Sequence, residues 1–146
     1  MTSALDDILS LADEPPRIWH IDPKDDDPRD ELARQSAFLR DVRIICPAVD
    51  IIAVPNAGKR SPWAAQKAKR EGLTAGALDL GCAWEGGRVA FLEFKDGKKM
   101  PTPAQRERLD RYVRQGHLCG VFRQEASALG ALRRWGAPFL VREGRL

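Results

Sequence analysis

The sequence predicts a single α/β domain in which helices flank a mixed β-sheet. Three observations carry this prediction. Segments with helical spacing alternate along the chain with short apolar runs that are typical of strands. Two of those runs are separated only by Glu85-Gly86-Gly87, which is a β-hairpin signal. The length of 146 residues suits one domain, and 43% hydrophobic residues are enough to build an ordinary core.

Caps and turns delimit the elements. Asp27 and Pro28 are typical of a helix start, and Pro55-Asn56-Ala57-Gly58 is a turn signal. Ser61-Pro62 begins a second helix and Thr102 caps a third. The predicted elements are a helix over 28–45, a strand over 49–54, a helix over 61–71, strands over 78–84 and 88–95, a helix over 102–115, a strand over 118–123 and a helix over 125–135.

The first predicted helix carries a stripe of residues at helical spacing, formed by Glu31, Gln35, Phe38, Val42 and Ile45. The last three members are apolar. We therefore expect the acid and the glutamine to lie on the side of the helix that faces the core.

The charge is unevenly distributed. Residues 1–31 hold ten acids and three bases, a balance of −7, whereas residues 32–146 hold eleven acids and twenty-one bases, a balance of +10. A basic body is typical of a protein that binds a polyanion, because each phosphate neutralised by Lys or Arg releases counterions; a solvated surface is the alternative. The acidic, proline-rich start predicts a flexible leader over residues 1–27, followed by a domain over 28–146.

The composition disfavours several classes of protein. The longest apolar stretch, 44–54, is broken by Pro47 and Asp50 and is too short for a membrane span. Asp6 and Asp7 stand where an export signal needs positive charge. The three cysteines are scattered, which disfavours a disulfide framework or a zinc site and predicts buried thiols. We therefore expect a soluble, cytoplasmic protein.

Charged residues interrupt both strands of the predicted hairpin. Glu93 and Lys95 share one face near the end of the second strand, and Asp79 lies at the start of the first. Taken singly, Glu93 and Lys95 are explained as a structural ion pair and Asp79 as a turn residue. If the strands pair, Asp79 and Glu93 converge, and two adjacent carboxylates are stable mainly around a cation. Oxygen ligands without a nearby His or Cys favour Mg²⁺ or Mn²⁺.

These residues resemble a known signature. Asp79, followed after thirteen residues by Glu93-Phe94-Lys95, is similar to the PD-(D/E)XK nuclease motif, with Leu78 in place of the proline. Residues 31–123 more specifically resemble the VRR-NUC domain. The matching features, in order, are the helix-borne pair Glu31 and Gln35, the turn Pro55-Asn56-Ala57-Gly58 with Lys59 and Arg60, the strand Gly76 to Asp79, the pair Glu93 and Lys95, and Gln105 at the next helix start.

The resemblance implies a restriction-endonuclease-like core that hydrolyses DNA phosphodiesters with Mg²⁺ or Mn²⁺. It implies that Asp79 and Glu93 bind the metal and that Glu31 completes its shell, directly or through water. Lys95 would orient the attacking water or stabilise the transition state, and Gln105 would position that lysine or the water. Two alternatives stay open: Glu31 as an i,i+4 partner on its helix, and Gln105 as half of a capping box with Thr102.

The resemblance also implies a partner. Free-standing VRR-NUC chains are similar to homodimeric enzymes that select branched DNA such as four-way junctions. A catalytically silent DNA-binding module with the same fold is the alternative function, and a structural protein whose buried charges simply pair is a third. The residues expected to contact DNA, each of which is otherwise a solvated surface group, are Asn56, Lys59, Arg60, Lys67, Lys69, Arg70 and Arg106.

Overall fold

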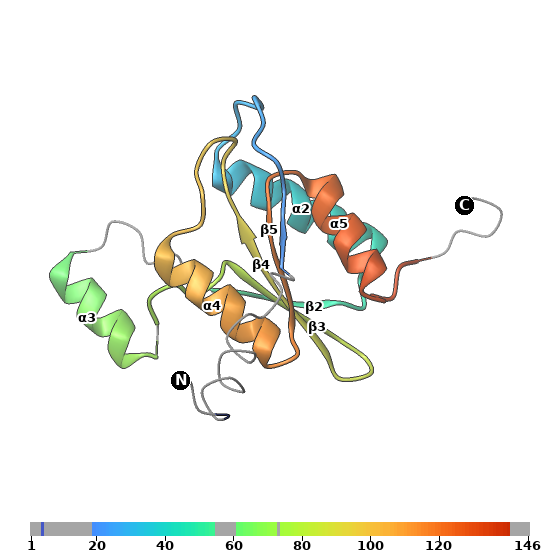
Figure 1. Ribbon diagram of the computed structural model, residues 1–146. Coiled ribbons are helices and arrows are strands. Elements are labelled where there is room, and N and C mark those ends of the chain that lie inside the picture. The colour runs from blue at the N-terminus through green and yellow to red at the C-terminus, as the bar shows by residue number, and fades with distance from the viewer. Residues whose placement is uncertain (1–3, 5–18, 55–60, 73, 141–146) are drawn as a thin grey trace.

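The computed structural model describes residue 4 and residues 19–54, 61–72 and 74–140. Apart from one short additional strand at the start, the elements occur in the predicted order (Figure 1). They are β1 (His20–Ile21), α2 (Glu31–Ile45), β2 (Asp50–Ala53), α3 (Pro62–Arg70), β3 (Leu80–Trp84), β4 (Arg88–Phe94), α4 (Pro103–Arg114), β5 (Leu118–Phe122) and α5 (Glu125–Arg134).

The strands form one mixed sheet in the order β1-β5-β4-β3-β2. The pairs β1–β5 and β5–β4 are parallel, whereas β4–β3 and β3–β2 are antiparallel. The predicted hairpin of β3 and β4 is therefore present, and β4 is the central strand. The side chains of β4 alternate between the two faces, so Phe91 and Glu93 share one face while Leu92 and Phe94 point to the other.

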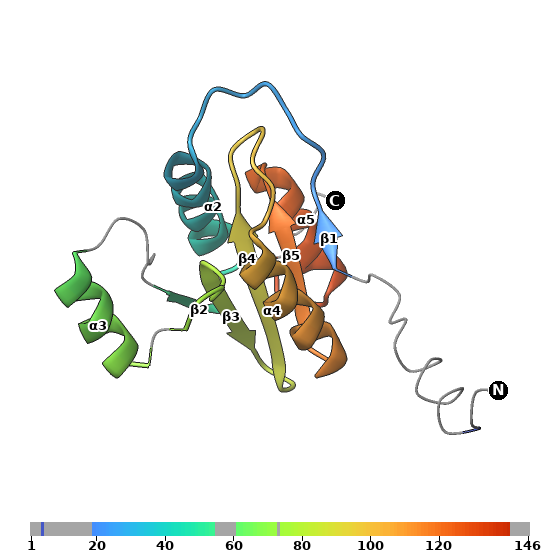
Figure 2. The ribbon, with the colours of Figure 1, turned by 60° about the vertical axis from the view of Figure 1, so that its left-hand side comes forward.

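Helices cover both faces of the sheet. Figure 2 shows α4 in front of the strands, with α2 and α5 behind them. The α2 and α5 side holds the larger core, which includes Phe38, Leu92 and Phe122. The α4 side holds a smaller core around Leu109 and Val121. All three cysteines are buried free thiols, as predicted. Among the described residues, none of the helices is both long and apolar enough to cross a membrane.

The segment over 19–27 is not the loosely packed leader that its composition predicts. β1 extends the sheet through parallel pairing of Ile21 with Val121. The buried Asp22 carboxylate then accepts hydrogen bonds from the backbone N–H groups of Arg123 and Gln124, at 2.7 and 3.3 Å. Those bonds support the start of α5, because the side chain of its N-cap residue, Gln124, makes no capping hydrogen bond to the helix. A two-residue strand is too short for a periodic pattern to indicate, so composition alone places this segment outside the domain. The rest of the predicted leader, residues 1–18, lies outside the described residues except for residue 4.

The start of α2 also differs from the prediction. Asp27 does not cap a helix at Pro28, because its carboxylate accepts hydrogen bonds from the backbone and guanidinium of Arg29. Asp30 is the N-cap instead and accepts from Ala33 N at 2.8 Å. The stripe is corrected as well: Ile45, expected on the core side, is 36% exposed.

α3 begins as predicted, because the Ser61 side chain caps it by accepting from Ala64 N at 3.2 Å. In both views the helix projects beyond the β2 edge of the sheet, away from the other helices (Figures 1 and 2). The turn predicted at 55–58, together with Lys59 and Arg60, lies outside the described residues.

Candidate active site

Two acids meet where β3 and β4 lie side by side. Asp79 immediately precedes β3, and its Oδ2 accepts a hydrogen bond from Phe94 N at 2.8 Å. In return, Glu93 Oε2 accepts from Asp79 N at 3.1 Å. Each carboxylate is thus held by the backbone of the other strand. This reciprocal pair confirms that the hairpin brings Asp79 and Glu93 together.

Gln105 joins this pair while it also caps α4. Its side-chain Oε1 accepts from Thr102 N at 2.9 Å, and Thr102 Oγ1 accepts from Gln105 N at 3.2 Å, which completes a capping box. The amide nitrogen on the other side of the same group donates to Glu93 Oε1 at 2.7 Å. The capping box is therefore confirmed, and the same cap fixes the side chain so that its N–H is aimed at Glu93 rather than at Lys95.

Gly76 allows the two halves of the site to approach. Its φ is +76°, and a Cβ at this position would lie 2.4 Å from the backbone oxygen of Ala104, in the first turn of α4. Only glycine combines that left-handed conformation with so close a contact. The segment that leads into Asp79 therefore packs directly against the helix start that carries Gln105.

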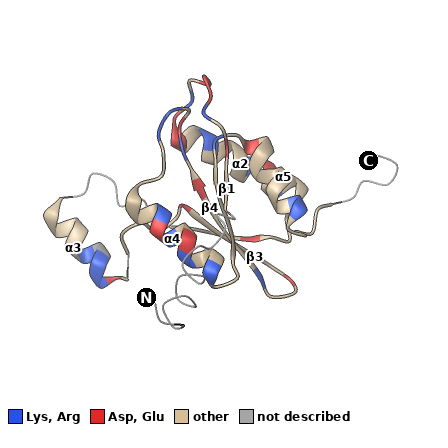
Figure 3. Ribbon diagram, viewed as in Figure 1, with Lys and Arg blue, Asp and Glu red and all other residues tan. Residues whose placement is uncertain are grey.

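Lys95 completes the group from the end of β4. It is 6% exposed, and its backbone N–H donates to Phe122 O at 3.0 Å, which keeps it in line with β5. Its Nζ lies 3.6 Å from Glu93 Oε1 and 3.9 Å from an oxygen of Glu31 at the start of α2. We call Glu31, Asp79, Glu93 and Lys95 the carboxylate cluster. It holds three acids and one base, and Figure 3 shows acidic residues on β4 and at the beginning of α2.

Both inner carboxylates are difficult to ionise. Burial, and next to it repulsion from Asp79, raises the pKa of Glu93 to about 8. Burial also raises the pKa of Asp79 above its ordinary value, with the charge of Glu31 adding to the effect. The single ammonium of Lys95 opposes these shifts without cancelling them. Further positive charge would therefore be favourable here.

The donor set fits a hard divalent cation. Two adjacent carboxylates are the usual protein contribution to a Mg²⁺ site, with water completing the shell. The predicted third acid is less close: in the part of the chain that the structure describes, no three acidic, His or Cys side chains are grouped tightly enough to hold a metal. Glu31 lies across Lys95 from Glu93, so its contact to a metal on Asp79 and Glu93 would run through water.

A second charged group, which sequence reasoning missed, supports the same edge of the sheet. Arg34 is fully buried, and its guanidinium donates to both carboxylate oxygens of Asp25 at 2.8 and 2.9 Å. It also donates to the carbonyls of Arg29, Asp27 and Arg123 at 2.6 to 2.9 Å. A signal was available, because Arg34 lies four and eight residues before Phe38 and Val42, on the face they bury.

Arg123 is also fully buried and holds the connection between β4 and α4. Its guanidinium donates to the carbonyls of Asp96 and Lys99, and its Nε donates to Asp22 O at 3.2 Å. Because this connection joins Lys95 to Thr102, Arg123 fixes the spacing between the lysine and the helix start that presents Gln105. We call Asp22, Asp25, Arg34 and Arg123 the arginine cluster.

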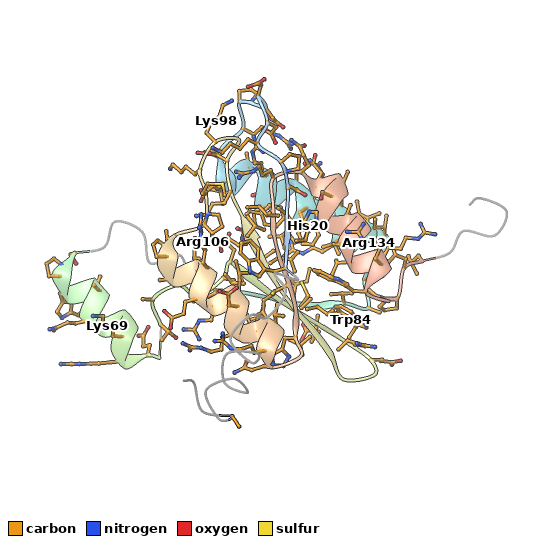
Figure 4. All side chains as sticks on the ribbon, viewed as in Figure 1. His20, Lys69, Trp84, Lys98, Arg106 and Arg134 are labelled. Carbon is orange, nitrogen blue, oxygen red and sulfur yellow. The ribbon has the colours of Figure 1, made fainter. Side chains whose placement is uncertain are left out.

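The predicted DNA-contacting residues are split between two surfaces. Lys67, Lys69 and Arg70 are exposed on α3, and Lys67 lies 5.7 Å from the centre of the Trp63 ring. Arg106 is exposed in the first turn of α4 (Figure 4) and follows Gln105 in the sequence. Asn56, Lys59 and Arg60 lie outside the described residues.

Comparison with known proteins identifies a structural relative. A solved structure described as "VRR_NUC domain protein" superimposes with a TM-score of 0.56 and 21% sequence identity, over 75% of this chain and 90% of that chain. No family model and no curated protein matches the sequence. At this identity the likeness shows a common fold. The α/β fold predicted from the sequence is therefore confirmed, and so, at the level of fold, is the resemblance to the VRR-NUC domain.

Proposed function

We propose that this protein is a metal-dependent DNA endonuclease. The observation that carries the proposal is the reciprocal Asp79–Glu93 pair, with Lys95 and Gln105 both directed at Glu93. Buried acids whose pKa is raised by desolvation and by a neighbouring acid are candidates for a functional site. The description of the structural relative as a VRR_NUC domain protein supports the same activity.

The roles of the residues follow from their contacts. Asp79 and Glu93 would hold Mg²⁺ or Mn²⁺, which polarises a phosphodiester and lowers the pKa of bound water. Gln105 keeps Glu93 in position by its 2.7 Å hydrogen bond. Lys95 is too far from either acid for a hydrogen bond, at 3.6 and 3.9 Å, so its three N–H donors are available to the attacking water and to a phosphoryl oxygen. The lysine therefore orients the water and stabilises the charge that develops on the phosphate.

We further propose that the substrate is branched DNA, such as a four-way junction, and that the enzyme acts as a homodimer. A two-fold symmetric pair would present one active site to each of two strands of a symmetric junction. The basic residues of α3, which projects from the domain, support contact with a second DNA arm.

Cleavage of a labelled panel tests the proposal. Single-stranded, duplex, flap and four-way junction DNA are incubated with Mg²⁺, Mn²⁺ or EDTA, using the wild type and Asp79→Asn. We expect cutting that requires the metal, prefers the junction and is lost in Asp79→Asn. Tight junction binding without any cutting would instead favour a DNA-binding module without turnover.

Thermal unfolding provides an assay that needs no DNA. A divalent ion at one hundred times its Kd should stabilise the wild type by about 2.7 kcal/mol. The same addition should leave Asp79→Asn unchanged. Equal shifts in both proteins would show that the ion binds elsewhere.

A further inference from the structure

A small pocket lies on the α4 side of the sheet, two strands away from Glu93 of the carboxylate cluster. It has a volume of about 140 Å³ and is lined by Trp19, Ile21, Met100, Arg106 and Asp110. Three of these side chains are apolar, one is a cation and one is an anion. None of them has a role in the chemistry described above, apart from the predicted DNA contact of Arg106.

The position of the pocket relates it to a bound strand. Ile21 pairs with Val121, which pairs in turn with Glu93, so the floor of the pocket and the catalytic acid lie in one row across the sheet. Two strand spacings separate them by about 10 Å, or about three steps of a stacked nucleic-acid strand. Arg106 is also the neighbour in sequence of Gln105, which contacts Glu93.

One wall of the pocket is an indole held by a hydrogen bond, and the pocket has room for an aromatic ring. Trp19 Nε1 donates to Asp110 Oδ1 at 2.9 Å, which fixes the indole against α4. A cavity of about 150 Å³ is known to hold benzene, so a pocket of this size accommodates one six-membered ring. A pyrimidine base meets that limit, whereas a purine is larger by a fused five-membered ring.

The polar groups of the pocket indicate which base it prefers and whether that base is paired. Asp110 Oδ2 is a free acceptor among the described residues. It can accept from the N4 amino group of cytosine, whereas thymine presents the O4 carbonyl at that position and its N3–H donor lies between two carbonyls that repel a carboxylate. Arg106 forms no ion pair with any described residue and is exposed, so its guanidinium is available for the phosphate of the same nucleotide. A base inside a duplex would first have to be extracted from its stack, which costs free energy.

We propose that this pocket binds an unpaired pyrimidine, with cytosine preferred to thymine, of the strand that the active site cleaves. The proposal rests on the proposed function, since it takes DNA as the substrate. It adds a specificity element: the enzyme would select DNA in which a base near the scissile phosphate is unpaired. Trp19 stacks on the base, Asp110 binds its amino group and Arg106 binds its phosphate.

Binding of labelled hexanucleotides in EDTA tests the pocket without any cleavage. We expect oligo-dC to bind about tenfold more tightly than oligo-dA, the size of effect that one base–aromatic stack supplies. Asp110→Asn retains the oxygen that Trp19 contacts but adds an N–H donor, so it should reverse or remove the preference for dC over dT. Arg114→Gln, an exposed arginine at the far end of α4, is the matched control and should preserve the preference.

The indole N–H signals in NMR give a direct readout that depends on no variant folding correctly. Addition of oligo-dC should shift the Trp19 signal and leave that of Trp84, in the opposite core, unchanged. Equal affinities for all hexanucleotides, or shifts confined to Trp63 on α3, would overturn the proposal. Because no metal is present, these outcomes do not depend on whether the protein cleaves DNA. Failure of the junction cleavage assay alone would overturn the proposed nuclease function, and failure of the binding and NMR experiments alone would overturn only the proposed base-binding pocket.

Discussion

The arginine cluster and the carboxylate cluster lie at the same edge of the sheet, and each combines buried charged groups with one half-buried acid, yet their acids behave in opposite ways. Hydrogen bonds from Arg34 hold the pKa of Asp25 well below its usual range, whereas burial raises that of Glu93 to about 8. The first cluster balances two arginines against two aspartates. The second has three acids and one lysine, a formal charge of −2. Burial alone therefore does not separate the two clusters. The second lacks positive charge for its acids, and with every acid ionised its formal charge of −2 is the charge that a divalent cation neutralises.

The largest effect on stability should come from breaking the balanced cluster. Arg34→Ala removes a guanidinium whose five N–H donors are all used and leaves Asp25 and three carbonyls without their partner. Urea denaturation should show a loss of about 3–5 kcal/mol, the range for breaking a buried pair. Arg40→Ala, on the same helix but 69% exposed, should cost less than about 0.5 kcal/mol. Similar losses in the two variants would mean that the cluster is not structural.

The largest effect on activity should come from the unbalanced cluster. Lys95→Ala removes the only cation of that group, and the rate of cleavage should fall by about 10²–10³-fold, as for loss of one transition-state donor. Junction affinity, measured in Ca²⁺ or EDTA, should remain nearly unchanged, since the buried Lys95 side chain offers little surface to a distant DNA arm. Turnover that survived in this variant would exclude lysine from the mechanism.

The pH dependence of stability sharpens the contrast. The raised pKa of Glu93 means that the folded, metal-free protein resists its ionisation. Below pH 4.5, the ordinary pKa of a glutamate, Glu93 is protonated in both the folded and the unfolded protein and does not affect the free energy of unfolding. Between pH 4.5 and about 8, Glu93 is protonated only in the folded protein, so unfolding releases a proton and the free energy of unfolding falls as the pH rises. Glu93→Gln should therefore stabilise the metal-free protein at pH 8, by an amount on the order of a few kcal/mol, and have little effect near pH 4.5.

Glu125→Gln is the matched control for that measurement. A hydrogen bond from Arg29 lowers the pKa of Glu125, so this acid is already ionised throughout the same pH range. Its substitution should destabilise the protein slightly, and by the same amount at pH 5 and pH 8. Thermal unfolding in EDTA at these two values distinguishes the variants. A gain in stability in both variants, or in neither, would contradict the raised pKa assigned to Glu93.

Most of the fold and the centre of the site could be predicted because they depend on local patterns. The alternation of side chains along β4 determines which residues face each side of the sheet, and the short turn before β4 makes β3 its neighbour. Together these two features bring Asp79 to Glu93. The ion pair between Asp25 and Arg34 could not be predicted from local sequence patterns. It requires the segment before α2 to fold back along the helix, a path that no periodicity encodes. β1 was missed for the same reason, since its two residues are defined by β5 and not by their own sequence.

The smallest predicted effect concerns long-range binding of DNA. Lys69 and Arg70 end α3, and Arg133 and Arg134 end α5, so the chain offers two adjacent basic pairs in the last turns of helices on different sides of the domain (Figure 1). Replacing either pair with glutamine removes the same charge. Only the α3 variant should lower the slope of log affinity against log salt, by up to about 0.9 for each phosphate that the pair neutralises in the wild type. Both variants reduce the net charge of the protein by the same amount. Equal slopes in the two variants would therefore show that the change depends on net charge alone and that α3 does not contact the DNA.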